Sequence, residues 1–243
     1  MRLIADLHTH SVYSRNGHGK GTVFENVQAA VALGLEEVAI TDHGLAHHFF
    51  GVRRSQLSNL RRDIRQAEKA FEGRIRVLMG VEANLLSLDG TTDLDQDLMD
   101  RLDIIVMGYH RGVRMKSLRD FFAVNVRGLL PFMRREAFRE RVTDAYMAAL
   151  ERYPINIWSH PGEYIPVNMK RAAPVAARRG TLIEINQRHP MDLDSLRAAQ
   201  DAGAKFVVSS DAHRPDRVGH VERALQQAQR AGIDPGRIVN IEA

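Results

Sequence analysis

The sequence predicts an α/β fold in which parallel strands close into a barrel and helices cover the outside. Apolar, β-branched runs of strand length alternate seven times with segments of helical spacing, which is typical of a parallel sheet with crossover helices. Histidines and carboxylates stand at the ends of six of these seven runs. A closed barrel brings all such ends to one rim, whereas an open doubly wound sheet divides them at a switch point.

Each predicted strand is a short run rich in Val, Ile and other apolar residues. In chain order the runs are RLIAD (2–6), EVAIT (37–41), RVLMGV (76–81), DIIVMGY (103–109), INIWS (155–159), LIEIN (182–186) and KFVVSS (205–210). The spacing between them leaves room for a helix after each strand.

The intervening segments carry apolar residues three or four positions apart, as one face of a helix requires. This spacing predicts helices over 57–71 and 136–153. Thr22 and Glu25 have the spacing of a capping box, which predicts a helix start at that point. Glycines follow the segments where helices should end, at Gly34, Gly73, Gly180, Gly203 and Gly232.

Length and composition predict one barrel domain over residues 1–243, with 44% hydrophobic residues available for a core. The start of the chain has no signal segment and no apolar run is long enough for a membrane span, so we expect a cytoplasmic location and no membrane association. The formal net charge of +4 is compatible with anionic partners, nucleic acid included. The oligomeric state is left open.

The chain has no cysteine, which excludes disulfides, thiol nucleophiles and thiolate metal sites. Any metal must therefore be held by imidazole and carboxylate groups. The candidate ligands at or beside the strand ends are His8, His10, Asp42, His43, Glu82, His110, His160, Asp211 and His213.

Two pairs of candidates have the spacing that places both side chains on one face of an extended strand. His8 and His10 flank Thr9, and Asp211 and His213 repeat the same i, i+2 spacing after the last strand. Because alternate residues of a strand share a face, each pair can grip one ion.

Two further carboxylates have different expected roles. Glu82 ends a run too apolar to leave a charge unpaired, so it predicts either a salt bridge or a carboxylate that bridges two cations, and we favour the bridge. Asp42 is adjacent to His43 and should face the opposite side of the strand. We expect Asp42 to fix the tautomer of a ligand imidazole from behind.

The stretch SRNGHGKG (14–21) is a glycine-rich loop that contains another histidine, His18. It does not satisfy the phosphate-binding P-loop pattern, because Ser14 stands where glycine is required and Gly21 follows Lys20. We expect the glycines to let the loop bend so that His18 reaches the rim. No G-x-S-x-G nucleophile elbow is present in the sequence, so a serine hydrolase has no support.

The motifs HTHS, TDHG, GVEAN, MGYH, SHPG and SDAH, in this order, resemble those of the polymerase and histidinol phosphatase (PHP) family. The resemblance covers essentially the whole chain and is to the small stand-alone branch with a three-metal site. It implies a distorted (β/α)7 TIM-like barrel with parallel strands and metal-dependent phosphoester hydrolysis. Arg15 and Asn16 stand where many relatives carry an acidic residue and a glycine, so the resemblance does not determine the conformation of the His18 loop.

The resemblance also implies how nine residues would hold three divalent ions. One ion would be bound by His8, His10, Glu82 and Asp211, a second by Glu82, His110 and His160, and a third by His18, His43 and His213. Such ligands suit Zn²⁺, Mn²⁺ or Fe²⁺. The expected reaction is attack of metal-bound hydroxide on a phosphomonoester, with release of phosphate.

Basic side chains near the rim are candidates for binding the substrate phosphate. Arg111 and Arg114 follow His110 closely, and Lys20 and Arg188 lie near other predicted rim loops. The segment 111–141 holds nine Arg or Lys against three acids, a pattern more typical of a solvated helical face than of a nucleic-acid site. We expect His189 and His220 to be ordinary surface histidines.

Three readings of the function remain open. The leading one is a phosphoesterase acting on a small phosphorylated substrate, with a nucleotide or DNA-end phosphatase or exonuclease of the same family as a variant. An amidohydrolase-type metal hydrolase also begins with H-x-H, but it usually has a strand-end lysine where Glu82 stands here. The third is a non-catalytic, metal-stabilised module that binds nucleic acid through 111–141.

Overall fold

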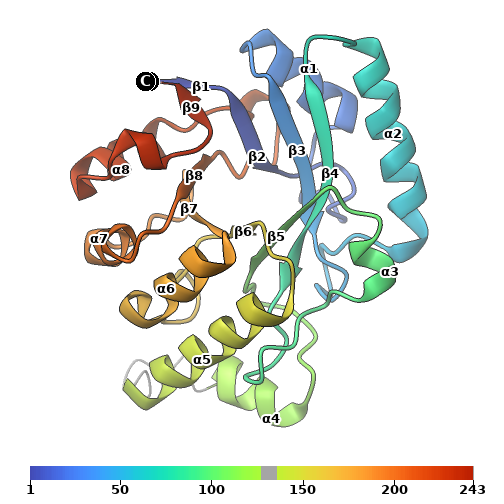
Figure 1. The fold of residues 1–243 in the computed structure, drawn as a ribbon. Coiled ribbons are helices and arrows are strands. Elements are labelled where there is room, and N and C mark those ends of the chain that lie inside the picture. The colour runs from blue at the N-terminus through green and yellow to red at the C-terminus, as the bar shows by residue number, and fades with distance from the viewer. Residues whose placement is uncertain (127–135, 243) are drawn as a thin grey trace.

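Seven parallel strands form a curved sheet that closes almost completely into a barrel, with helices on the outside (Figure 1). A computed structural model of the chain describes residues 1–126 and 136–242. The strands, in sheet order, are β2 (Ala5–Thr9), β3 (Glu37–His43), β4 (Arg76–Asn84), β5 (Ile104–Gly108), β6 (Ile157–Trp158), β7 (Leu182–Asn186) and β8 (Phe206–Ser209). The predicted barrel of seven parallel strands is confirmed.

The barrel closes where the first strand meets the last. Thr9 forms a parallel bridge with Ala212, and the amide of His10 donates a hydrogen bond to the Ala212 carbonyl at 2.7 Å. No regular ladder joins β2 and β8 within the described residues, so the barrel is nearly rather than fully closed. This seam places the H-x-H segment directly beside the segment that carries Asp211 and His213.

The start of the chain differs from the prediction of a single strand over 2–6. A short strand β1 (Arg2–Leu3) pairs antiparallel with β9 (Ile241–Glu242), so the two ends of the chain lie side by side (Figure 1). The barrel strand begins only at Ala5. The Asn240 side chain donates to the carbonyls of Ala5 and Val208 and so ties this region to the last barrel strand. Such a long-range contact has no local signal in the sequence.

Two strands continue beyond their predicted ends. β3 includes His43 and β4 includes Glu82, and these two residues are direct neighbours in the register of the parallel pair. Because paired residues in neighbouring strands share a face, His43 and Glu82 point to the same side of the sheet. The ladder itself therefore fixes part of the site.

Helices connect the strands and cover the outer face of the sheet (Figure 1). They are α1 (Val23–Ala32), α2 (Leu57–Ala70), α3 (Gln96–Met99), α4 (Leu118–Phe121), α5 (Glu136–Arg152), α6 (Met169–Arg179), α7 (Leu193–Asp201) and α8 (Glu222–Ala231). Short 3-10 turns occur at Arg54–Gln56, Pro215–Arg217 and Pro235–Arg237, and a π-helical turn at Phe122–Val126. The predicted capping box of Thr22 and Glu25 is present at the start of α1. Among the described residues no helix has both the length and the apolar character to cross a membrane.

Two layers of apolar side chains support the barrel. The larger core lies between the sheet and the helices, and a smaller one fills the barrel interior with Ala5, Leu7, Ala39, Leu78, Ile104, Val106, Ile157 and Val207. Along β4, Leu78 belongs to the interior core and Glu82 follows four positions later on the same face. The barrel is therefore apolar at the start of the strands and polar at their ends.

A bulge in β2 changes which side chains enter the barrel. The pairing with β3 shifts between Asp6 and Thr9, so that one residue of β2 is extra. As a result His8 joins the polar interior although Leu7, its direct neighbour, belongs to the interior apolar core. Simple alternation along the strand would not allow both.

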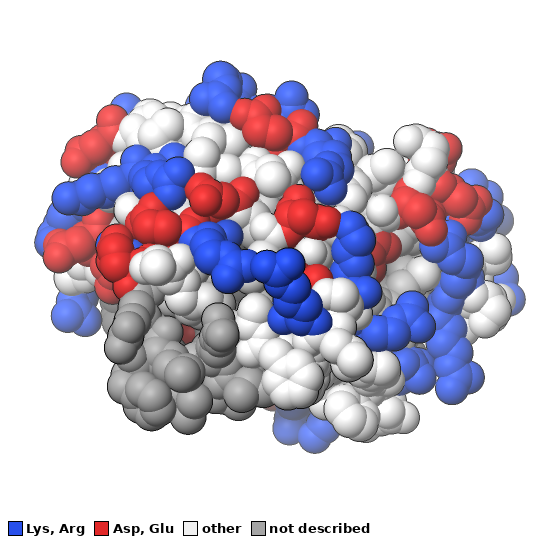
Figure 2. All heavy atoms as spheres, turned by 90° about the horizontal axis from the view of Figure 1, so that it is seen from below, with Lys and Arg blue, Asp and Glu red and all other residues white. Residues whose placement is uncertain are grey.

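Charged side chains of both signs are interspersed over the face seen from below (Figure 2). The middle of the basic segment 111–141, residues 127–135, lies outside the described residues. In its described parts, Lys116 pairs with Asp89 at 2.6 Å and Arg139 with Glu136 at 2.6 Å. These exposed ion pairs are those of a solvated surface, as the sequence predicts for this segment.

Candidate metal centre

The candidate ligands converge around the carboxylate of Glu82, which is 1% exposed. Imidazole nitrogens from three strand ends and from the H-x-H segment lie within 4 Å of its two oxygens. To Oε1 the distances are 2.8 Å from His160 Nε2 and 3.2 Å from His110 Nε2; to Oε2 they are 3.1 Å from His43 Nδ1, 3.4 Å from His8 Nε2 and 3.7 Å from His10 Nε2. Each oxygen of Glu82 thus faces a different set of imidazoles.

Asp211 supplies a second buried carboxylate to the same cluster. Its Oδ1 lies 3.2 Å from His10 Nε2 and 4.0 Å from His8 Nε2. The potential ligand atoms of His8, His10 and Asp211 lie within 4.8 Å of one another, close enough to bind one ion. Asp211 has a backbone φ of 51°, a conformation that costs energy in residues other than glycine and recurs at functional sites.

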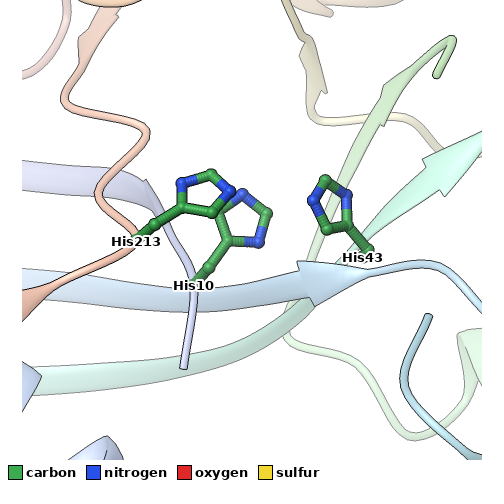
Figure 3. Close-up of side chains that lie close together, drawn as sticks. All are labelled: His10, His43 and His213. Atoms are coloured by element: carbon green, nitrogen blue, oxygen red, sulfur yellow. The ribbon is translucent and has the colours of Figure 1, made fainter. Parts of the chain in front are cut away.

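A third group of possible ligands is made of histidines alone (Figure 3). His10, His43 and His213 come from three separate segments, and their rings face a common space. His18 extends this group from the glycine-rich loop, with its Nε2 2.9 Å from Nε2 of His213. His43, Glu82 and His110 form a further group with metal-ligand spacing among the described residues. His43 therefore stands between two groups, where the family resemblance assigned it to one.

Several buried ligand atoms have no hydrogen-bond partner among the described residues. These atoms are His8 Nε2, His10 Nε2, both ring nitrogens of His43 and Glu82 Oε2. A buried polar atom without a partner costs roughly 1–3 kcal/mol. Nitrogen and carboxylate atoms that point together in this way fit bound divalent cations, and their chemistry suits Zn²⁺, Mn²⁺ or Fe²⁺.

Other side chains hold the ligand imidazoles from behind. Nδ1 of His8 lies 2.7 Å from Glu184, Nδ1 of His110 lies 3.0 Å from Asn84, and Nδ1 of His10 lies 3.2 Å from the Ser14 hydroxyl. In each case the opposite ring nitrogen faces the cluster, as in metal sites where a second group fixes the tautomer. The sequence reading missed Glu184, although a carboxylate within the apolar run LIEIN is the same signal that identified Glu82.

Asp42 accepts no hydrogen bond from an imidazole within the described residues, contrary to the prediction. Its buried carboxylate accepts hydrogen bonds from the amides and hydroxyls of Ser11 and Ser14. Because Asp42 and His43 face opposite sides of β3, Asp42 reaches the turn after the H-x-H motif instead. Burial raises the pKa of Asp42 to about 6 against the effect of these hydrogen bonds. The Ser14 hydroxyl links Asp42 to Nδ1 of His10.

The loop that carries His18 is fastened to a neighbouring loop by the two residues that depart from the family pattern. The Arg15 guanidinium donates to the carbonyls of Gly51 and His48, and the Asn16 amide donates to the carbonyl of Phe49. The His18 ring stacks on Phe50 with the ring centres 3.8 Å apart. These contacts give His18 a defined position.

The glycines of this loop permit the close approach that the sequence suggested. Gly17 has a φ of 70°, and a Cβ at Gly19 would lie only 1.9 Å from the Ser11 carbonyl oxygen. A side chain at either position would therefore disturb the backbone.

The four predicted substrate contacts lie in different places. The Arg188 guanidinium reaches the cluster, with one nitrogen 2.6 Å from Nδ1 of His213 and 3.6 Å from Asp211. Arg111 lies over the ring of Tyr164, which lies 6.0 Å from the His110 ring. Lys20 and Arg114 are exposed. Arg114 lines a separate cavity with Asp93 and Asp95, whose lining includes none of the cluster histidines.

His189 is not an ordinary surface histidine, and that prediction is wrong. Its side chain is 19% exposed, its Nε2 lies 3.6 Å from Asp211 and its Nδ1 lies 3.2 Å from Glu163. The ring is 5.2 Å from that of His160. His189 lies shortly after β7, which ends at Asn186, so its position after a strand end was the signal that could have identified it.

The metal centre has two halves of different charge. The carboxylate half consists of His8, Glu82, His160, Glu184 and Asp211. Burial by itself lowers the pKa of His8, but Glu184 and Glu82 more than offset it, so this pKa lies well above its usual value. Burial raises the pKa of Glu82, yet His110 and His8 outweigh burial and hold it well below its usual range.

The imidazole half consists of His18, His43 and His213, and His10 stands at its boundary with the carboxylate half. Burial lowers the pKa of His43 to about 3, and burial together with His213 and Arg188 lowers that of His18 to about 4. Burial and the neighbouring rings of His213 and His43 also hold the pKa of His10 well below its usual value. These imidazoles are neutral at physiological pH, which is the form that binds metals.

Comparison with known proteins gives relatives over the full length of the chain. A family model described as the PHP domain matches residues 6–235. A probable phosphatase of Thermoanaerobacter sp. strain X514 is 28% identical over 258 residues, an alignment that covers 100% of this chain and 92% of that protein. The probable phosphatase YcdX of Escherichia coli O81 strain ED1a is 27% identical over 251 residues, covering 97% of this chain and 89% of that protein.

A solved structure confirms the fold. Histidinol phosphate phosphatase from Lactococcus lactis subsp. lactis Il1403, in complex with zinc, L-histidinol and phosphate, superposes with a TM-score of 0.66 at 16% identity. The match covers 96% of this chain and 95% of that chain. Since the family model extends over almost the whole sequence and the predicted motifs form one cluster, the chain belongs to the PHP domain family.

Proposed function

We propose that this protein is a metal-dependent phosphatase that hydrolyses a small phosphomonoester to phosphate and an alcohol. The observation that carries the proposal is Glu82, a buried carboxylate faced by five imidazoles whose nitrogens partly lack hydrogen-bond partners. Membership of the PHP domain family and the similarity to proteins named probable phosphatases support the same activity.

The ligands form sets that would bind up to three divalent ions. Glu82 would bridge two ions, because each of its oxygens faces a different set of imidazoles. His8, His10 and Asp211 complete one set, and His110 and His160 another. The imidazole half, which includes His18, would hold the third ion. When bound, such ions activate water and stabilise negative charge on phosphoryl oxygens.

Residues of the chain itself orient the substrate. Arg188 lies where its guanidinium can bind phosphoryl oxygens beside His213. Arg111, stacked on Tyr164, forms part of a wall near His110 and can contact the alcohol portion or the phosphate. Glu184 and Asn84 keep the ligand imidazoles in position while charge changes at the reacting phosphate.

The other candidate functions have less support. The third strand of the barrel carries Glu82 near its end, where the amidohydrolase pattern has a lysine. A non-catalytic module would have no need for a ligand set this complete. A nucleotide or a DNA end remains a variant substrate for the same chemistry. A nucleic-acid partner, a cytoplasmic location and the identity of the metal stay predictions.

The test is phosphate release from p-nitrophenyl phosphate by protein that has been stripped with a chelator and then loaded with Zn²⁺, Mn²⁺ or Fe²⁺. We expect turnover only after loading, with the metal content measured in the same samples. Undiminished turnover by protein with negligible metal would contradict the proposal. Full loading without release from any phosphomonoester would favour the non-catalytic module.

A further inference from the structure

A cavity of about 460 Å³ opens directly beside the metal centre, and its function is not explained by the hydrolysis of a simple phosphate ester. Asp211 and His213 form one wall, so the cavity is continuous with the cluster. Basic side chains from the segments after β7 and β8 line the rest: Arg188, Arg214, Arg217, His220 and Arg223. A volume of this size is within the range of sites for small ligands.

The positive charge in this cavity is only partly neutralised. Arg214 pairs with Asp216, with its Nε 2.9 Å from that carboxylate, and Arg188 lies 3.6 Å from Asp211. Arg217 lies 4.0 Å from the same carboxylate, so two guanidinium groups share one acid. Arg223 donates its backbone amide to Gln187, and its side chain has no ion pair within the described parts of the chain. Like charges that converge on one space repel one another unless an anion lies between them.

We propose that this cavity binds a second anionic group of the substrate, carried on the alcohol that leaves, while the phosphate to be hydrolysed lies at the metal centre. The substrate class is therefore a phosphomonoester that bears a further phosphate or carboxylate. This inference rests on the proposed phosphatase function. Arg188 lies at the boundary, because it lines the cavity and also contacts His213.

The geometry favours a small substrate with two separate anionic groups over a simple ester for two reasons. The guanidinium fork of Arg217 or Arg223 is well shaped for the paired oxygens of a phosphate or carboxylate. Both residues lie in one short region, Arg217 in the turn Pro215–Arg217 and Arg223 in the first turn of α8, directly after the segment that carries His213. A ligand fixed at His213 therefore needs little length to reach them.

The experiment measures binding of non-hydrolysable phosphonates to metal-loaded protein by calorimetry. The probes are butylphosphonate, butane bisphosphonate and phosphonobutyrate, which share a chain and differ in the second group. Wild-type protein should bind the bisphosphonate roughly tenfold more tightly than butylphosphonate, the gain expected from one charge-assisted contact. A gain for phosphonobutyrate as well would extend the class to carboxylates, and a gain for the bisphosphonate alone would restrict it to a second phosphate.

The double variant Arg217→Gln, Arg223→Gln removes the two charges while it keeps polar side chains of similar length. In this variant the bisphosphonate should lose most of its advantage over butylphosphonate. It should keep only the small advantage that comes from having two equivalent ends, either of which can bind at the metal centre. The matched control is Arg65→Gln, an exposed arginine on α2 that should keep the wild-type ratio of the two affinities. The ratio should also fall with added salt, because the contact is between charges.

Equal affinity of wild-type protein for all three probes, after allowance for the two ends, would overturn the inference. So would a preference for the bisphosphonate that survives in the double variant. Neither result would contradict the proposed phosphatase function, which is tested separately by release of phosphate from butyl phosphate. Conversely, a preference for the bisphosphonate without any hydrolysis of butyl phosphate would support the anion site and contradict the proposed phosphatase function.

Discussion

The two halves of the metal centre lie at the same rim of the barrel but differ in the charge of the groups that would bind a cation. The carboxylate half surrounds the space with buried negative charge, and the pKa of Glu82 and that of Asp211 are held well below their usual values by nearby histidines, against the effect of burial. The imidazole half offers neutral rings, with the Arg188 guanidinium 2.6 Å from His213. An ion bound in the first half would be compensated by these carboxylates, whereas an ion bound in the second half would keep most of its charge.

This difference predicts that the two halves have different affinities for metal ions and different roles. Coulomb attraction in a buried site favours the half that carries the carboxylates. An ion bound in the imidazole half should be held more weakly and should attract an anionic substrate more strongly. The cavity with Arg217 and Arg223 adjoins His213, on the imidazole side. Positive potential is thus concentrated where an anion would enter.

The largest effect is expected when the negative charge of the carboxylate half is removed. Glu82→Gln keeps the volume but loses the anion that faces both groups of imidazoles. We expect at least one ion to be lost and turnover to fall on the order of a thousandfold, since metal charge stabilisation contributes several kcal/mol. Elemental analysis and phosphate release measure both quantities. The matched control is Glu72→Gln, a change at an exposed glutamate. Full metal content and a wild-type rate in Glu82→Gln would contradict the proposal that Glu82 bridges two ions.

A smaller effect should follow from a change in the imidazole half. His18→Ala should lose one ion of three and lower turnover on the order of a hundredfold, with the ions of the carboxylate half still bound. The fold should persist, because the His18 ring stacks on Phe50 at the surface of the loop rather than in the core. Anomalous scattering from crystals locates each ion. Three fully occupied positions in this variant, or only two in fully active wild-type protein, would show that His18 binds no catalytic ion; the exposed His48→Ala controls for loss of an imidazole.

A still smaller effect is expected behind the carboxylate half. Glu184→Gln removes the charge that lies 2.7 Å from Nδ1 of His8 but keeps a group that can accept a hydrogen bond. Metal affinity should fall roughly tenfold to a hundredfold, as is usual when a group that orients a ligand imidazole is lost. Titration with a competing chelator measures the affinity, and the thermal midpoint of the metal-free variant separates this effect from misfolding. An unchanged affinity would return Glu184 to a purely structural role.

The smallest effect concerns the pH dependence of the metal-free protein. The pKa of His18 is about 4 in the folded state and near ~6.5 when the chain is unfolded. Between these values the unfolded chain binds the proton and the folded protein does not, so the stability due to His18 is lost as pH falls from about 6.5. His18→Ala should therefore narrow the difference between the thermal midpoints at about pH 7 and about pH 5. An equal difference in wild type and variant would contradict the lowered pKa.

Much of the centre could be recognised from residue types at strand ends, because parallel strands of a barrel deliver their ends to one rim. That rule led to His8, His10, His43, Glu82 and His110 without any coordinates. The same rule, applied more strictly, would have added His189, and the signal of a carboxylate within an apolar run would have added Glu184. It failed at Asp42, whose partners are two serines on a turn that the strand pattern does not describe.

By itself, the sequence determined the seven-stranded barrel, the absence of thiolate chemistry and the identity of most candidate ligands. These features depend on periodicity and residue type, which are local properties of the chain. Only the tertiary structure decided how the ligands are shared, because the bulge in β2 and the register of His43 with Glu82 set the direction of each side chain. It also decided the position of His18, since Arg15 and Asn16 bind carbonyl groups more than thirty residues away in the chain. Contacts between distant segments have no periodic signal, and so the division of the centre into a carboxylate half and an imidazole half emerges only when the chain folds.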